Sequence, residues 1–172
     1  MTKIIFISGN GGSTTKDNWF PSLKTELEPH PPEVIDAEFP DPILARKSFW
    51  IPYLIETLNV DDDTILVGYS SVAIAAVGAY YTDLGMESEK KSGYFDRPWD
   101  FDKIIQNQKW TIIFSSQDDP WIPIEQPRYI HKNLNCEYHE YKDQGHFGGD
   151  YFKSDFPELS AAILRKIKKL SI

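Results

Sequence analysis

Three side chains of this sequence could together carry out acyl transfer. Ser70, Asp119 and His146 stand in the order serine, acid, histidine along the chain. A serine that attacks a carbonyl carbon needs a base to accept its proton, and the base needs a carboxylate that fixes its tautomer and stabilises the imidazolium. This order is the one expected of α/β-hydrolases and differs from that of other serine-hydrolase folds. We therefore take the three residues as the candidate nucleophile, acid and base.

Such chemistry also needs N–H groups that stabilise the negative oxygen of the intermediate. The backbone N–H of Ser71, directly after the candidate nucleophile, is one expected donor. A second donor is expected from Asn10 and Gly11, in a loop where glycine lets the backbone approach a ligand closely. The predicted oxyanion hole therefore consists of Ser71, Asn10 and Gly11.

The candidate residues all follow segments that are predicted to be strands. Five short apolar runs fit buried strands, namely residues 3–8, 33–39, 64–68, 110–115 and 136–141. In sheets of parallel strands, ligands bind at the carboxyl ends of the strands. The glycine loop 9–12 follows the first run and Ser70 the third, while Asp118-Asp119 and Gly145-His146 follow the last two. One edge of the sheet is thus expected to collect all the candidate residues.

Helical patterns alternate with these strands. Helices are predicted over residues 18–28 and 124–133. Another should start at Asp41, as an N-cap with Pro42 in the first helical position, and a last one should follow a capping box at Asp155. Pro52 should interrupt the second helix, and the alanine-rich stretch after Ser71 should be helical or tightly packed. The pattern predicts a three-layer α/β-hydrolase-like sandwich, with a mostly parallel sheet of about five strands and helices on both faces.

Composition narrows the classes of function. The 172 residues fit one globular domain over 1–172, with 41% hydrophobic residues. A net charge of −8 disfavours nucleic acid and anionic membranes as partners. Cys136 is the only cysteine, and the apolar run before Gly9 is too short for a signal peptide, so we expect a cytoplasmic protein. The 9–12 loop lacks the lysine of a phosphate loop, and we expect no cofactor and no metal ion.

Each motif also has a simpler interpretation. The segment 68–71 fits a strand-to-helix turn, 118–120 fits an ordinary turn, and Gly145-His146 fits a bend with a packed imidazole. Two alternatives to a hydrolase therefore stay open: a binding or scaffold module on a catalytically impaired hydrolase fold, and a flavodoxin-like nucleotide-binding domain that uses the 9–12 loop. The hydrolase hypothesis depends on the motifs occurring together, each after a strand.

With these residues in place, the chain resembles the retinoblastoma-binding protein 9 group of small serine hydrolases, relatives of the bacterial YdeN-type proteins. The matching segments are 9–12 with Trp19, 40–42 with Ala45 and Arg46, Trp50 with Pro52, 68–76, 82–85, 92–95 with 97–99, 118–120 with Pro123, and 145–147. The resemblance implies hydrolysis of a small ester or amide through an acyl-enzyme. It also implies that Ser70 is the nucleophile, that Asp119 rather than Asp118 is the acid, and that His146 is the base.

The chain departs from the family pattern in three places. Segment 68–72 reads Gly-Tyr-Ser-Ser-Val where the family has Gly-His-Ser-x-Gly, and Val72 should crowd the turn at a cost of about 1–3 kcal/mol. Between Val77 and Tyr80 about fourteen residues are absent, which predicts the loss of a central strand. The strand before Asp119 would then move by about 4.8 Å, or the sheet would re-pair. Residues 58–62 lack the Leu-x-Cys-x-Glu motif, so no motif supports a retinoblastoma-type protein partner.

Overall fold

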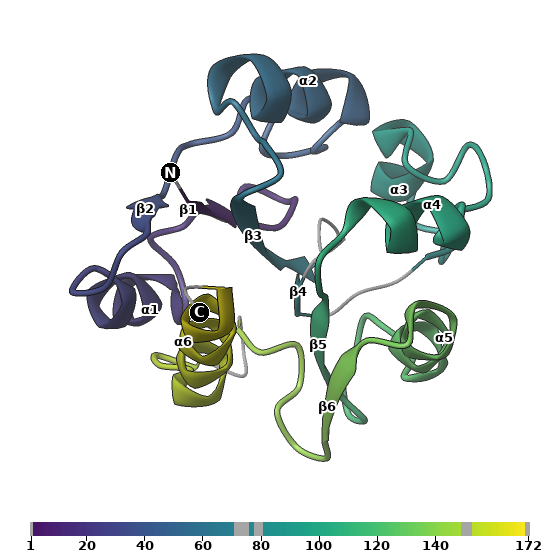
Figure 1. Ribbon diagram of the computed structural model, residues 1–172. Coiled ribbons are helices and arrows are strands. Elements are labelled where there is room, and N and C mark those ends of the chain that lie inside the picture. The colour runs from purple at the N-terminus through teal and green to yellow at the C-terminus, as the bar shows by residue number, and fades with distance from the viewer. Residues whose placement is uncertain (1, 71–75, 78–80, 149–152, 171–172) are drawn as a thin grey trace.

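The computed structural model describes residues 2–70, 76–77, 81–148 and 153–170. Within these ranges the chain forms a six-stranded sheet in the order β2-β1-β3-β4-β5-β6 (Figure 1). The strands are β1 (Lys3–Ile7), β2 (Glu33–Ile35), β3 (Thr64–Tyr69), β4 (Ala76–Val77), β5 (Ile112–Ser116) and β6 (Glu137–Tyr141). Each strand pairs in parallel with its neighbour. The predicted α/β class with a mostly parallel sheet is confirmed, and the described residues form six strands where about five were predicted.

Helices cover both faces of this sheet. They are α1 (Phe20–Leu27), α2 (Lys47–Pro52), the π-helix η1 (Tyr53–Thr57), α3 (Glu87–Ser92), α4 (Phe101–Asn107), α5 (Glu125–Leu134) and α6 (Pro157–Leu170). Helices α1 and α6 lie side by side on one face, and α2, α4 and α5 lie on the other (Figure 1). No helix in the described part of the chain is long and apolar enough to cross a lipid bilayer.

The side chains of β1 show why the sheet is buried on both faces. Ile4 and Phe6 pack into a cluster with residues of α1 and α6, while Ile5 and Ile7 pack with Trp50 of α2 on the opposite side. Successive strand residues point to opposite faces, so a central strand covered by helices on both sides must be apolar throughout. The continuous apolar run that indicated this strand in the sequence has this physical cause.

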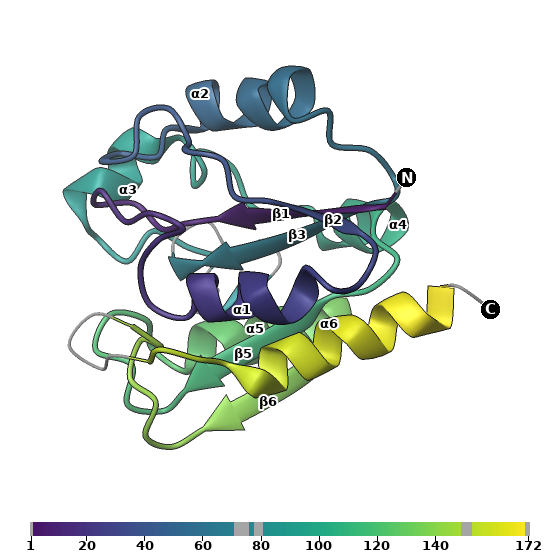
Figure 2. The ribbon, with the colours of Figure 1, turned by 90° about the vertical axis from the view of Figure 1, so that its left-hand side faces the viewer.

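All carboxyl ends of the strands lie at one edge of the sheet. Figure 2 shows the arrowheads of β1, β3, β5 and β6 pointing towards the same side. The loops that follow these strands therefore meet, although β1 ends at Ile7 and β6 ends only at Tyr141. Parallel pairing brings the ends of β3 and β6 to this edge, and Ser70 and His146 follow them there.

The predicted loss of a central strand is wrong. Ala76 and Val77 form β4, which pairs with Gly68 and Tyr69 of β3 on one side and with Phe114 of β5 on the other. Two residues suffice because the longer strands on either side extend the sheet beyond them. The strand before Asp119 therefore has not moved into a vacant position next to β3. Residues 71–75, with Val72 and the start of the expected helix, lie outside the described residues, and residues 76–77 are strand rather than helix.

The predicted start of the second helix is also wrong. Asp41 has φ +53°, and its carboxylate accepts hydrogen bonds from the backbone N–H and the guanidinium of Arg46. Helix α2 begins only at Lys47, because this ion pair closes a turn before the helix instead of capping it. Pro52 interrupts the helix as predicted, since it has no N–H to donate, and the chain continues as η1.

Candidate active site

Ser70 stands on a sharp turn directly after β3. Its φ is +63°, in the left-handed region that residues with a side chain rarely adopt, and such strain collects at functional sites. The turn also lies against the loop after β1, since a Cβ on Gly9 would be 2.9 Å from the Cβ of Ser70. Only glycine at position 9 lets the two loops approach this closely, so the end of β1 helps to position Ser70.

The imidazole of His146 connects Ser70 to Asp119. Its Nε2 lies 2.9 Å from Ser70 Oγ, and its Nδ1 lies 2.8 Å from Asp119 Oδ2. An ionised Asp119 can only accept, so Nδ1 carries the proton and Nε2 is left to accept from the serine hydroxyl. The side chains of His146 and Asp119 are only 11% and 3% exposed, and low exposure strengthens both hydrogen bonds.

The second oxygen of Asp119 is held by the backbone. Its Oδ1 accepts hydrogen bonds from the N–H of Trp121 at 2.9 Å and of Ile122 at 3.0 Å. A buried carboxylate without such donors would be costly to keep ionised. The turn after β5 thus fixes the position of Asp119 and gives its second oxygen two hydrogen-bond donors.

Tyr69 packs against the other side of the site. Its ring centroid lies 5.2 Å from that of His146, and its ring is nearly perpendicular to that of Trp19 in the core, with the centroids 6.0 Å apart. Burial and the nearby charge of Asp119 raise the pKa of the Tyr69 phenol, so this side chain stays neutral. Tyr69 therefore gives the imidazole an uncharged wall at the position where the family pattern has histidine.

The predicted oxyanion donors differ in their hydrogen bonding. The N–H of Gly11 donates to the carbonyl of Ile43 at 3.0 Å, and the N–H of Gly12 donates to that of Pro42 at 3.1 Å. Gly11 is therefore already engaged in this conformation, and Asn10 is the better candidate in this loop. Ser71 lies outside the described residues.

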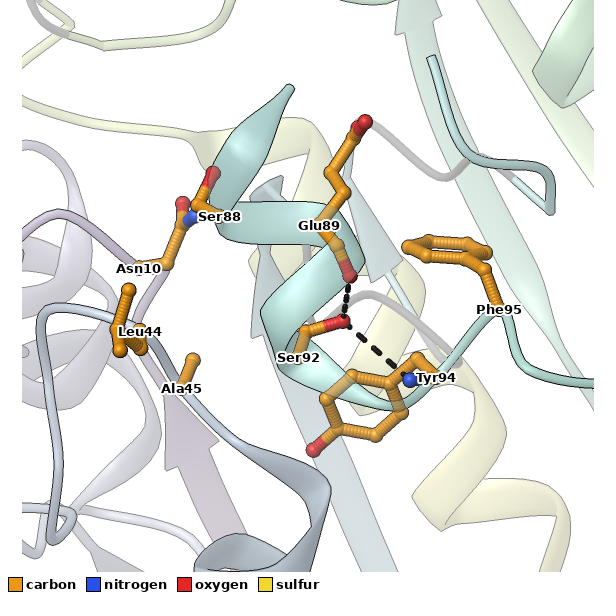
Figure 3. A pocket seen from close by; sticks show the side chains of 8 residues that line it. All are labelled: Asn10, Leu44, Ala45, Ser88, Glu89, Ser92, Tyr94 and Phe95. Carbon is orange, nitrogen blue, oxygen red and sulfur yellow. Dashed lines mark hydrogen bonds between the residues drawn. The ribbon is translucent and has the colours of Figure 1, made fainter. Parts of the chain in front are cut away.

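Asn10 lines a small cavity between the glycine loop and α3. The other residues around it are Leu44, Ala45, Ser88, Glu89, Ser92, Tyr94 and Phe95 (Figure 3). Ser92 is part of the cavity wall. Its hydroxyl donates a hydrogen bond to the carbonyl of Glu89 and accepts one from the N–H of Tyr94. The volume of about 10 Å³ fits one water molecule. The cavity is too small for an acyl group.

Known proteins resemble this chain over most of its length. No protein-family model matches it. The rat serine hydrolase RBBP9 is 36% identical over 167 residues, which cover 88% of this chain and 90% of that protein. The chain belongs to the RBBP9 family of serine hydrolases. It is therefore an enzyme of the hydrolase class.

More distant RBBP9 relatives agree with this assignment. The hydrolase YdeN of Bacillus subtilis is 22% identical over 169 residues, covering 86% of this chain and 87% of its own. The crystal structure of the ydeN gene product from B. subtilis superposes with a TM-score of 0.85 at 19% identity, over 98% of this chain and 100% of the other. A YdeN-like hydrolase from Pectobacterium atrosepticum gives a TM-score of 0.66 at 15% identity, over 95% and 89%. At these identities the two structures establish the fold.

In this RBBP9-family chain the structure brings together the three residues that sequence reasoning assigned to the triad. Asp118 does not bond to the imidazole: its Oδ1 accepts from the hydroxyl of Ser116 and from the N–H of Gly145. Sequence reasoning missed Gly9 as the neighbour of Ser70, and it missed Ser116. The available signal for Ser116 was a hydroxyl at the carboxyl end of a strand that begins with three apolar residues, at the position where side chains meet the site.

Proposed function

We propose that this protein hydrolyses small esters or amides through an acyl-enzyme intermediate on Ser70. The observation that carries the proposal is the continuous pair of hydrogen bonds from Ser70 Oγ to His146 and from His146 to Asp119. Membership of a serine hydrolase family supports the reaction class. The strained backbone of Ser70 supports its role, because a sharp turn after a strand exposes the nucleophile at the top of the sheet.

In the first half of the reaction, Ser70 Oγ attacks the carbonyl carbon of the substrate while its proton passes to His146 Nε2. The negative carbonyl oxygen then accepts hydrogen bonds from backbone N–H groups, for which Asn10 and Ser71 are our candidates. The bond from the carbonyl carbon to the leaving group breaks, and His146 returns the proton to that group. Asp119 stabilises the imidazolium throughout without taking the proton itself.

In the second half, water replaces the leaving group. The oxygen of a water molecule attacks the acyl carbon while His146 accepts a proton from that water, and a second tetrahedral intermediate forms. The bond between the acyl carbon and Ser70 Oγ breaks, and His146 gives the proton back to the serine. The products are a carboxylic acid and the free enzyme, so no cofactor is consumed.

The test is labelling by a fluorophosphonate, which reacts with a serine that its base has activated. Wild-type protein should be labelled, whereas Ser70→Ala and His146→Ala should not be, with cooperative thermal unfolding in all three. Ser71→Ala is the matched serine control and should keep the label, because its expected contribution is a backbone N–H. Labelling of Ser70→Ala, or an unlabelled but folded wild type, would overturn the proposal.

A parallel assay with p-nitrophenyl acetate and with an acyl p-nitroanilide separates esters from amides. A stoichiometric burst of nitrophenol followed by slower turnover is expected if the acyl-enzyme accumulates. Turnover that Ser70→Ala retains would contradict an acyl-enzyme on this residue.

A further inference from the structure

The loop that carries His146 is tied to the end of β5 by two side chains that do not bond to the imidazole. The hydroxyl of Ser116 accepts the N–H of Gln144 at 2.9 Å, and Oδ1 of Asp118 accepts the N–H of Gly145 at 2.8 Å. Ser116 in turn donates to Asp118 Oδ1 at 2.6 Å. The backbone N–H groups of Gln144 and Gly145, directly before His146, thus both donate to side chains at the end of β5 and in the turn after it.

These hydrogen bonds connect the chain beyond the ends of β5 and β6, where the pairing of the two strands stops. The last residue pair of β5 and β6 is Ser116 with Tyr141, and one further hydrogen bond joins the N–H of Gln117 to the carbonyl of Tyr141. Beyond it, side-chain acceptors take the place of backbone carbonyls. Ser116 and Asp118 therefore fix the separation of the two loops at the point where strand pairing no longer can.

The backbone around His146 needs such support. Gly145 has φ +50° and Phe147 has φ +57°, so the imidazole is carried between two residues in the left-handed region. For Phe147 this conformation is strained, and it persists only when the surroundings enforce it. On the far side Phe147 is fully buried and stacks on Phe156 at 5.4 Å. On the near side the supporting contacts are those of Ser116 and Asp118.

The two adjacent acidic residues thus hold the His146 side chain and the main chain directly before it. Asp119 Oδ2 bonds to the imidazole, while Asp118 Oδ1 bonds to the main chain one residue before it. Because both carboxylates belong to one turn, a displacement of the turn would move the imidazole and its acid together. The hydroxyl of Ser116, followed by the N–H of Gly145, lowers the pKa of the Asp118 carboxyl, which suits an acceptor that stays ionised.

We infer that Asp118 and Ser116 are positioning residues, which set the distance from His146 to Ser70 by holding the backbone of the His146 loop. This inference rests on the proposed function of Ser70 and His146. An error of about 1 Å in the placement of a catalytic group can slow a reaction by about 100-fold. Loss of the Asp118 contact should therefore slow the chemical step and leave the affinity for a ligand unchanged.

The test measures fluorophosphonate inactivation as a function of reagent concentration, which separates the maximal rate constant from the half-saturating concentration. For Asp118→Ala the maximal rate constant should fall about 10-fold to 100-fold, with the half-saturating concentration unchanged. Asp118→Asn keeps an oxygen that can accept from Gly145, so it should recover to within about threefold of wild type. Ser116→Ala should be slowed as well, and it replaces Asp118→Ala should that variant fail to fold.

The matched control is Asp143→Ala, in the same loop. Asp143 is exposed, and its carboxylate accepts a hydrogen bond from Gln144 of its own loop, so the maximal rate constant should not change. All variants are compared well below their unfolding temperatures, so that a loss of stability alone does not move the rate.

Two results would overturn the positioning role: wild-type inactivation of a folded Asp118→Ala, or an Asp118→Asn variant as slow as Asp118→Ala. A wild-type protein that resists labelling would instead remove the proposed function, and the positioning role with it.

Discussion

The contact between Gly9 and Ser70 gives the sharpest test of how the sheet positions the nucleophile. In Gly9→Ala the new methyl carbon would lie 2.9 Å from Ser70 Cβ and 3.4 Å from both Ser70 Oγ and the carbonyl of Tyr69. Ordinary contact begins at 3.4 Å, so Ser70 must retreat by about 0.5 Å. The retreat is resisted because the turn is strained and because the hydroxyl is bonded to His146.

Two quantities should change in this variant. Overpacking of this kind costs about 1–3 kcal/mol of unfolding free energy. A displacement of about half an ångström should also slow fluorophosphonate labelling of Ser70 about tenfold, since an error of about 1 Å costs about 100-fold. The φ of Gly9 is not in the left-handed region, so both effects would be steric.

The assay pairs urea unfolding with the labelling rate. Ile163→Val on α6, in the core and away from the site, should cost about 0.5–1.5 kcal/mol and leave the labelling rate unchanged. If Gly9→Ala were labelled at the wild-type rate, the close approach of the two loops would not be what positions Ser70, and the reasoning would fail.

Two further predictions concern stability. The pKa of Glu140 is lowered from 4.5 to about 2, chiefly by hydrogen bonds from Arg128. The stability that this pair contributes is therefore present above pH 4.5 and is lost as the pH falls towards 2. Glu140→Gln should flatten the fall in unfolding free energy across this window, as measured by urea unfolding at several pH values, and an unchanged slope would contradict the assignment. Trp50→Phe removes the hydrogen bond from the buried indole to the carbonyl of Pro40 and should cost about 1–3 kcal/mol, and wild-type stability by the same method would show that this bond is dispensable.

The sequence predicted the parts of the fold that follow from periodicity. The strands β1, β3 and β5 were recognisable because a strand covered on both faces is a nearly continuous apolar run, and each of them contains at least three consecutive apolar residues. The order serine, acid, histidine was recognisable because it reflects the order of strands in the sheet. The choice of Asp119 over Asp118 came from the family resemblance, and the structure places Asp119 on the imidazole.

Other features left no periodic signal. Strand β4 has two residues, too few to show any alternation, so its existence depends on the strands beside it. Helices α3 and α4 have six and seven residues, and no apolar stripe indicated them in the sequence. The start of α2 was misplaced because aspartate before proline is typical of a helix start, whereas here the Asp41 carboxylate pairs with Arg46. The contact between Gly9 and Ser70 joins residues far apart in sequence, and only the folded sheet reveals it.

The short β4 has a consequence for the protein as a whole. It divides the sheet into two halves, one ending in β3 and the other beginning with β5. Among the described residues, two residue pairs join β4 to β3 and one joins it to β5, so the seam between the halves is narrow. Ser70 belongs to the first half, whereas Asp119 and His146 belong to the second. The hydrogen bond from Ser70 to His146 therefore crosses the seam, as does α6, which follows β6 and packs on α1. A substrate that contacts residues of both halves would connect them, so that binding at the site would also stabilise the sheet.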